Sequence, residues 1–180
     1  NAYSFYLYGS PFFWFSLLFP QRWLPYLMVP LLVLKFGVAG GGAYLYLKRY
    51  VKNWDYAVLG ACLYALSGFA VYNVFFNHFV DVVALFPYLL WALDEAMYNK
   101  RHGLFAFWVA VNLLNNYFFF AGQVVFLAIY FVCKLTTGDY RLTVKRFVQL
   151  AFESLLGVAM GCLLLVPAVL SLLQNPRTID

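Results

Sequence analysis

Residues 103–133 read GLFAFWVAVNLLNNYFFFAGQVVFLAIYFVC, an apolar stretch without a single charged side chain. A run of about 20 apolar residues spans the hydrocarbon of a bilayer, and a soluble domain of this size would not need several such runs. The rest of the 180-residue chain follows the same pattern, since 65% of it is hydrophobic and only 11% is charged. The sequence therefore predicts an all-α protein, a polytopic bundle of transmembrane helices.

The same stretch decides how many times the chain crosses the membrane. One helix over residues 103–133 would be about 46 Å long, against a hydrocarbon thickness of about 30 Å. We predict instead a hairpin of two short helices, roughly 104–118 and 123–136, which returns the chain to the side from which it came. Polar and small residues form the predicted turn: Asn115, Asn116, Gly122 and Gln123.

Further apolar runs lie on both sides of the hairpin. Four more spans are expected, for about six in all: residues 24–47, 54–76, 82–97 and 147–173. Residues 1–23 are rich in aromatic side chains, which gather at membrane–water boundaries. We therefore divide the chain into an external interfacial segment, 1–23, and a transmembrane bundle, 24–180, within a larger membrane domain. Because the chain starts at Asn1 rather than Met, we expect it to be a piece of a longer protein.

Lys and Arg cluster between the apolar runs, and the six-span order distributes them unequally. Nine fall on one side: Lys48, Arg49, Lys52, Lys100, Arg101, Lys134, Arg141, Lys145 and Arg146. Only Arg22 and Arg177 fall on the other side, and Lys35 lies within a span. Such an asymmetry marks the cytoplasmic side, so we expect the remaining polar groups on the extracytoplasmic face. The net charge of +5 is then a matter of topology and anionic headgroups rather than of nucleic acid.

Lys35 lies near the middle of the first span. An ionisable group at that depth is costly and usually faces a cavity or a partner. One interpretation is a cation that holds a lipid-linked phosphate entering from the bilayer. The alternatives are a lysine that snorkels outward, or one paired with a carboxylate in a part of the protein outside this chain.

His78 and Asp81 stand three residues apart in the turn Asn77–Asp81, which we expect at the outer end of a span. One turn of helix would place their side chains together. An Asp here could act as a general base or hold a divalent cation, with His78 orienting it or sharing the metal. The alternative is that Asp81 only caps the third span.

Four amides interrupt the apolar hairpin. Asn112, Asn115 and Asn116 share one helix face by their spacing, and Gln123 follows in the predicted turn. They could hydrogen-bond sugar hydroxyls, or they could tie helices together, which is the commoner use of membrane amides. We assign no chemistry to Asp94 and Glu95, because pairing with Lys100 and Arg101 at the interface accounts for them.

Two G-x-x-x-G patterns, Gly37 to Gly41 and Gly157 to Gly161, predict close helix packing. Several longer motifs carry a resemblance to a known family. They run collinearly along nearly the whole chain: Gly9–Phe12, Leu63–Phe69, Asn77–Asp81, Leu85–Pro87, Leu90–Asp94, Asn116–Phe119, Leu165–Leu170 and Asn175–Arg177. With these motifs the chain resembles the YfhO family of bacterial membrane proteins.

This resemblance implies a multi-pass protein of the bacterial cell membrane, a GT-C-type glycosyltransferase whose active face is extracytoplasmic. Such an enzyme takes a sugar from a polyprenyl-phosphate carrier and passes it to a cell-envelope polymer such as lipoteichoic acid. Its partners would be membrane lipid, the lipid-linked sugar and the glycopolymer acceptor. Lys35 or Arg177 could stabilise the leaving phosphate.

The family also implies an acidic motif in the first external loop, and none precedes Gly9. The principal catalytic Asp is therefore expected outside this chain, and Asp81 would be a second carboxylate of the site. A large extracellular C-terminal part is likewise expected beyond it. A non-enzymatic transporter or flippase subunit, with Lys35 in a midplane site, is the rival interpretation. A purely structural module is a third.

Overall fold

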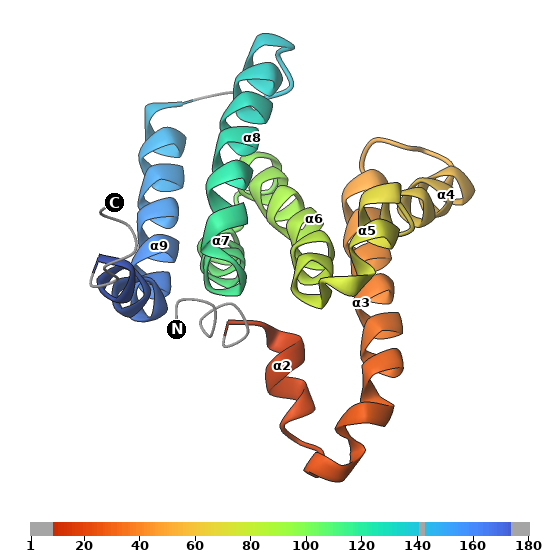
Figure 1. Cartoon of the computed structure of the whole chain (residues 1–180). Coiled ribbons are helices and arrows are strands. Elements are labelled where there is room, and N and C mark those ends of the chain that lie inside the picture. Colours follow the sequence, from red (N-terminus) through yellow and green to blue (C-terminus); the bar gives the residue numbers. More distant parts are fainter. Residues whose placement is uncertain (1–8, 141–142, 174–180) are drawn as a thin grey trace.

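The computed structural model describes residues 9–140 and 143–173, and every regular element in these two ranges is a helix. Figure 1 shows their arrangement in chain order: α2 (Pro11–Ser16), η2 (Gln21–Trp23), α3 (Leu24–Leu47), α4 (Trp54–Ala65), α5 (Gly68–Tyr72), η3 (Asn73–Phe75), α6 (Asn77–Tyr98), α7 (Leu104–Asn115), α8 (Tyr117–Thr136) and α9 (Val144–Leu173). The predicted all-α fold is confirmed.

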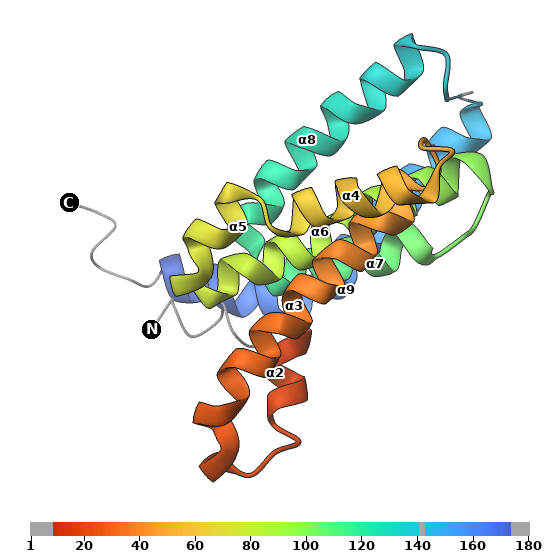
Figure 2. The ribbon, with the colours of Figure 1, turned by 90° about the vertical axis from the view of Figure 1, so that its right-hand side faces the viewer.

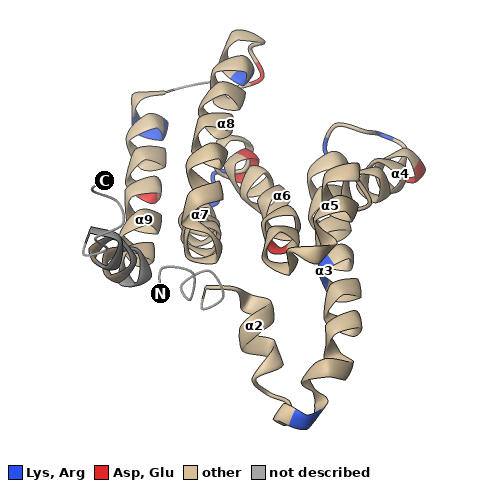
Figure 3. Cartoon of the chain, viewed as in Figure 1, with Lys and Arg blue, Asp and Glu red and all other residues tan. Residues whose placement is uncertain are grey.

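The long helices run back and forth between two ends of the bundle. The links after α3, α6 and α8 meet at one end, which lies at the top of Figure 1 and at the right of Figure 2. Lys and Arg gather there (Figure 3), so we call it the basic end. The starts of α6 and α8 lie at the opposite end, which we call the Asp81 end. α2 and the first turns of α3 project beyond the bundle (Figure 2).

Length and composition single out three segments of the described chain as able to cross a membrane: Gln21–Leu47, Trp54–Phe75 and Tyr117–Thr136. α7 is a shorter apolar helix. The outer faces of α3, α4 and α8 carry large apolar side chains that remain exposed, such as Val33, Leu63 and Ile129. Faces of this kind suit contact with lipid, because apolar side chains are solvated favourably by the hydrocarbon of the bilayer.

α6 is the central helix, and most of its residues are buried. It packs against α3 on one side and α7 on the other, while α4 covers α3 and α9 covers α7. One apolar core joins α6 to α7 and α8 around Leu93, Val109 and Phe120. A second joins α2, α3 and α6 around Phe12 and Ala84. Both ends of the buried helix carry charge, and these charges need partners.

The second span, predicted for residues 54–76, agrees with the candidate span Trp54–Phe75, which is built of three successive short helices. α4 ends at Ala65, and the Ser67 hydroxyl accepts a hydrogen bond from Ala70 N, 3.4 Å away, to start α5. A serine side chain can replace a backbone acceptor in this way, which favours a helix start at that point. The chain then passes through η3 into α6.

The prediction that Asn77–Asp81 form a turn is wrong, because these five residues begin helix α6; their position on the outer side stays a prediction. Phe76 is the residue before the helix, so Asp81 does not cap it. The hairpin is confirmed as two helices, but its break is Asn116 alone. Asn116 is extended at φ −160°, and its side-chain oxygen accepts from Phe119 N at 3.2 Å. Gln123 consequently lies inside α8 rather than in the turn.

The glycine patterns differ in their role. A Cβ at Gly157 would lie 2.6 Å from the Ala106 carbonyl oxygen, and one at Gly161 would meet Leu113, so this pattern is the contact between α9 and α7. In the first pattern Gly41 faces the Tyr88 hydroxyl, whereas nothing lies within 4 Å of a Cβ at Gly37. Close packing is confirmed for the pair on α9 and, on α3, for Gly41 and the adjacent Gly42, whose Cβ would lie 2.6 Å from the Tyr88 ring, but not for Gly37.

Candidate functional site

Lys35 and Asp81 form a buried ion pair. Lys35 Nζ lies 2.5 Å from Asp81 Oδ1, and the side chains are 6% and 2% exposed. Lys35 comes from the middle of α3 and Asp81 from the second turn of α6, two helices that pack closely. Figure 3 shows the charged band of α3 facing that of α6. The partner of the mid-helix lysine is therefore within this chain.

Neighbouring groups complete the coordination of the pair. Ser10 Oγ donates to Asp81 Oδ2 at 2.6 Å, and Lys35 Nζ donates to Asn77 at its side-chain oxygen (2.5 Å) and its carbonyl (3.2 Å). The Phe12 ring centre lies 5.4 Å from the ammonium. We call these five residues the Asp81 centre: Ser10, Phe12, Lys35, Asn77 and Asp81.

Local sequence explains how these side chains meet. Asn77 and Asp81 are four residues apart on α6, so both point toward α3. Ser10 is the N-cap of α2, where its hydroxyl also accepts from Phe13 N, and Pro11 follows in the first helical position. Proline there suits a helix start because its missing N–H would have no partner in the helix. The start of α2 thereby places the Ser10 hydroxyl within hydrogen-bond distance of Asp81.

The energetics of such a pair are set by burial. Taking two charges out of water is expensive, and the cost is recovered only when both are paired and further hydrogen bonds satisfy them. Asp81 has the ammonium on one oxygen and Ser10 on the other, so both conditions hold. Removing one partner alone would leave a buried, uncompensated charge.

His78 lies three residues before Asp81 on α6 and packs among aromatic rings, 4.4 Å from the ring centre of Phe79. No group of three or more His, Cys, Asp and Glu side chains that could hold a metal ion exists among the described residues. Asp81 already has a cation 2.5 Å from one oxygen. This donor set does not fit a divalent cation, and we derive no step through one.

The hairpin junction lies next to the Asp81 centre. A Cβ at Gly9 would fall 1.6 Å from the Leu114 carbonyl oxygen, so the residue before Ser10 touches the end of α7. The Phe79 and Phe119 rings, one turn into α6 and α8, are 4.9 Å apart. The structure thus brings the hairpin junction to the same end as Lys35 and Asp81.

The four amides of the hairpin are all buried: Asn112, Asn115, Asn116 and Gln123. Asn112 donates to the Trp108 carbonyl at 2.9 Å, and Asn116 caps α8. Each nevertheless leaves one buried side-chain atom without a hydrogen-bond partner in the described structure. Buried polar atoms are nearly always paired, so these four atoms are exceptions in the described structure. Arg177 lies outside the described residues, and its role stays a prediction.

A second polar cluster, at the basic end, surrounds Asp94 and Glu95. Glu95 pairs with Arg49 and, at 3.3 Å, with Arg101, which confirms the predicted Arg101 pairing for Glu95, whereas Asp94 has Arg49 3.8 Å away. Asp94 is 1% exposed and accepts hydrogen bonds from three tyrosine hydroxyls: Tyr50, Tyr130 and Tyr140. These tyrosines come from three separate parts of the chain. We call this set the Asp94 network.

Comparison with protein families gives one match. The family model described as bacterial membrane protein YfhO matches residues 1–180, the whole chain. No curated protein and no solved structure matches.

Proposed function

This chain belongs to the YfhO family of bacterial membrane proteins, and we propose that it is part of a membrane glycosyltransferase of the GT-C type. The sugar would come from a polyprenyl-phosphate carrier and pass to a cell-envelope polymer such as lipoteichoic acid. We place the reaction at the Asp81 end, on the extracytoplasmic face. The observation that carries the proposal is the buried Lys35–Asp81 pair, 2.5 Å apart, between two helices of a chain that is 65% hydrophobic.

The orientation rests on charge. The links and helix ends of the basic end hold eight of the ten described Lys and Arg residues, and positively charged links of this kind lie in the cytoplasm in membrane proteins. The Asp81 end then faces outward, where an envelope polymer is found. Intramembrane ionisable residues in bundle interiors commonly mark substrate pathways, which favours this centre over any other in the described chain.

Lys35 is the group that we assign to the carrier phosphate. An ammonium has three N–H donors, and three oxygens already lie within 3.2 Å of Nζ: Asp81 Oδ1, Asn77 Oδ1 and Asn77 O. A phosphate therefore binds Lys35 by exchanging with one of them, and the Asn77 side chain is the neutral one of the three that can turn away. Lys35 then stabilises the charge that develops on the phosphate as it leaves the anomeric carbon.

Asp81 holds Lys35 in place before the carrier arrives, and it stays beside the ammonium when the phosphate takes the place of the Asn77 side chain. The acceptor oxygen forms the new bond to the anomeric carbon as the bond to the lipid phosphate breaks. Its proton passes to a carboxylate, either Asp81 or the principal Asp that family resemblance expects outside this chain. Asn115, Asn116 and Gln123 offer buried amide atoms for sugar hydroxyls.

The test compares single and paired substitutions in the full-length protein. Lys35→Met with Asp81→Leu removes both charges, so the double variant should insert and fold. It should nevertheless lose sugar transfer from polyprenyl-phosphate sugar by roughly 10²-fold or more, because electrostatic stabilisation of the leaving group is worth that much. Full transfer by a folded double variant would refute the proposal. Carrier binding without transfer by the wild type would favour the transporter interpretation.

A further inference from the structure

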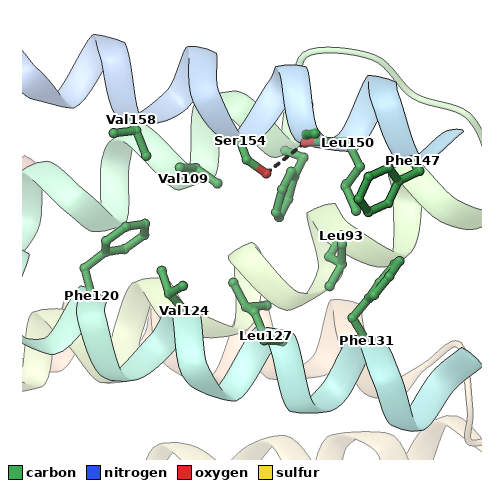
Figure 4. A pocket seen from close by; sticks show the side chains of 13 residues that line it. Leu93, Val109, Phe120, Val124, Leu127, Phe131, Phe147, Leu150, Ser154 and Val158 are labelled. Atoms are coloured by element: carbon green, nitrogen blue, oxygen red, sulfur yellow. Dashed lines mark hydrogen bonds between the residues drawn. The ribbon is translucent and has the colours of Figure 1, made fainter. Parts of the chain in front are cut away.

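Glu153 is a buried carboxylate that belongs to neither the Asp81 centre nor the Asp94 network. It lies in the third turn of α9 and is 4% exposed. Phe147 and Val158 face α8 across an apolar groove (Figure 4), whereas Glu153 lies one turn before Gly157, on the face of α9 that packs against α7. Ionisable side chains inside apolar bundles are costly and commonly functional, so the surroundings of Glu153 decide what it does.

Two polar side chains reach Glu153 from the basic end. Gln149, one turn earlier on α9, donates from Nε2 to Glu153 Oε1 at 3.1 Å. His102, in the link between α6 and α7, has its Nδ1 3.8 Å from the same oxygen and within hydrogen-bond distance of Gln149 Nε2. The other oxygen, Glu153 Oε2, is buried and has no hydrogen-bond partner in the described structure. The three side chains form a triangle in which the carboxylate has capacity for a further donor.

The hydrogen bonds of this triangle depend on the protonation of His102. An amide NH₂ group has two hydrogens, so Gln149 Nε2 donates one to Glu153 Oε1 and the other to an unprotonated His102 Nδ1. Once Nδ1 takes up a proton it becomes a donor, and two donors then face each other. Glu153 Oε1 offers the protonated ring a charged acceptor, and bonds of that kind shorten to about 2.8 Å. Proton uptake therefore exchanges the Gln149 bridge for a direct pair.

The charges around His102 act in both directions. His102 and Gln149 line a polar hollow of about 300 Å³, together with Lys100, Thr143, Lys145 and Arg146. The three cations of the hollow oppose proton uptake by His102, and Glu153 favours it. Arg101, from the same link, is paired with Glu95 of α6, and α7 carries no charged side chain.

Protons reach the triangle from the water, because His102 is 69% exposed. Imidazole is the side chain that ordinarily changes its charge between about pH 5 and 8, a range in which Lys and Arg stay charged. The part that moves is Gln149, because its amide loses the acceptor on His102 and its side chain already borders the hollow.

We propose that His102, Gln149 and Glu153 form a pH-sensitive latch between the α6–α7 link and α9. Above about pH 8, Gln149 bridges the other two side chains. Below about pH 6, protonated His102 pairs directly with Glu153, the link is drawn toward α9, and the Gln149 amide turns into the hollow. The pH at the basic end thus sets how tightly the link is held. The latch lies far from the Asp81 centre along the bundle and does not depend on the proposed sugar transfer.

The test uses the full-length protein in lipid nanodiscs, with its native cysteines replaced and a trifluoromethyl label on Thr143→Cys. Thr143 is exposed and lines the hollow. The fluorine NMR signal should move between two positions in one titration from about pH 8 to pH 5.5. His102→Gln should abolish this shift. His78→Gln, the same change at the only other histidine of the sequence, is the matched control and should leave the shift intact.

Glu153→Gln keeps the size of the side chain and removes its charge. The midpoint of the titration should then move to lower pH by about one unit, a roughly tenfold weaker uptake of the proton, because the cations of the hollow remain. Gln149→Leu should abolish the shift by removing the moving amide. Absence of a shift in the wild type, an unchanged shift in His102→Gln or Gln149→Leu, its loss in His78→Gln, or an unmoved midpoint in Glu153→Gln would each overturn the proposal.

Discussion

The Asp81 centre and the Asp94 network lie at opposite ends of α6, and each surrounds a buried carboxylate with a different set of partners. Asp81 is held by one ammonium and one hydroxyl. Asp94 is held by three tyrosine hydroxyls, with Arg49 3.8 Å away. The Asp94 network has several interchangeable donors from several parts of the chain, which is typical of a structural clamp. The Asp81 centre has few donors and neighbours with unpaired amide atoms, which is typical of a site that accepts a ligand.

The largest expected difference follows from removing one carboxylate at each end. Asp81→Leu leaves Lys35 buried without a carboxylate within ion-pair distance among the described residues, so it should destabilise the protein by about 3–5 kcal/mol. Glu95→Leu should cost less, because Arg49 is 22% exposed and keeps Asp94 nearby. Unfolding in detergent measures both. Equal losses of stability in the two variants would contradict the distinction between the Asp81 centre and the Asp94 network. Adding Lys35→Met should restore much of the lost stability in Asp81→Leu but not in Glu95→Leu.

Ser10→Ala should have the next largest effect. It removes the only side-chain hydroxyl that donates to Asp81 in the described structure, and hydrogen bonds to charged groups are worth about 1.5–3 kcal/mol. Because Ser10 also caps α2, Ser10→Thr is the matched control that keeps a hydroxyl. Sugar transfer should fall with Ser10→Ala and largely survive with Ser10→Thr. A Ser10→Ala protein with wild-type stability would show that Asp81 does not need this donor.

Tyr130→Phe should have a smaller effect, on the order of 1 kcal/mol, because two other hydroxyls still reach Asp94. The same loss of one hydroxyl therefore costs more at Asp81 than at Asp94. Thermal unfolding of Tyr130→Phe beside Ser10→Ala tests this order directly. Transfer per folded molecule should be unchanged in Tyr130→Phe. If Tyr130→Phe lost more stability than Ser10→Ala, the hydroxyl donors of the Asp94 network would be less interchangeable than we propose.

The smallest effect is expected for Asp139→Asn, in the link at the basic end. Lys134 donates to Asp139 at 2.8 Å, and this hydrogen bond lowers the pKa of the exposed Asp139 carboxyl. A lowered pKa means that the pair adds to the free energy of unfolding at pH values above the pKa of an ordinary Asp. This stabilisation is lost as the pH falls through the pKa of Asp139 in the folded protein. Exposed pairs contribute little, so the midpoint of unfolding should not change measurably at neutral pH.

The sequence predicts the helices better than it predicts their contacts. The first span matches α3, and the charge-free stretch 103–133 does fold back, because no single helix of that length fits a bilayer. The error at Asn77–Asp81 has a physical cause. Polar residues at the end of an apolar run look the same whether they form an external turn or the buried start of a helix that faces a charged partner.

The pairing of Lys35 with Asp81 could not be derived from the sequence, because it depends on the packing of α3 against α6. The depth of Lys35 did indicate that a partner was needed. The three tyrosines around Asp94 lie 36 to 46 residues from it along the chain, and nothing in their local patterns distinguishes them from other aromatic residues at the interface. The role of Asn116 as the break is local, and its amide is a good helix cap.

The most direct test compares Lys35→Met with Arg49→Met in the full-length protein. Each substitution removes one cation from a carboxylate on α6, one at each end, and each should lower stability. Transfer of sugar from polyprenyl-phosphate, measured per folded molecule, should fall by roughly 10²-fold or more in Lys35→Met and stay within a few-fold of wild type in Arg49→Met. Equal transfer by the two variants would contradict a functional role for the Asp81 centre.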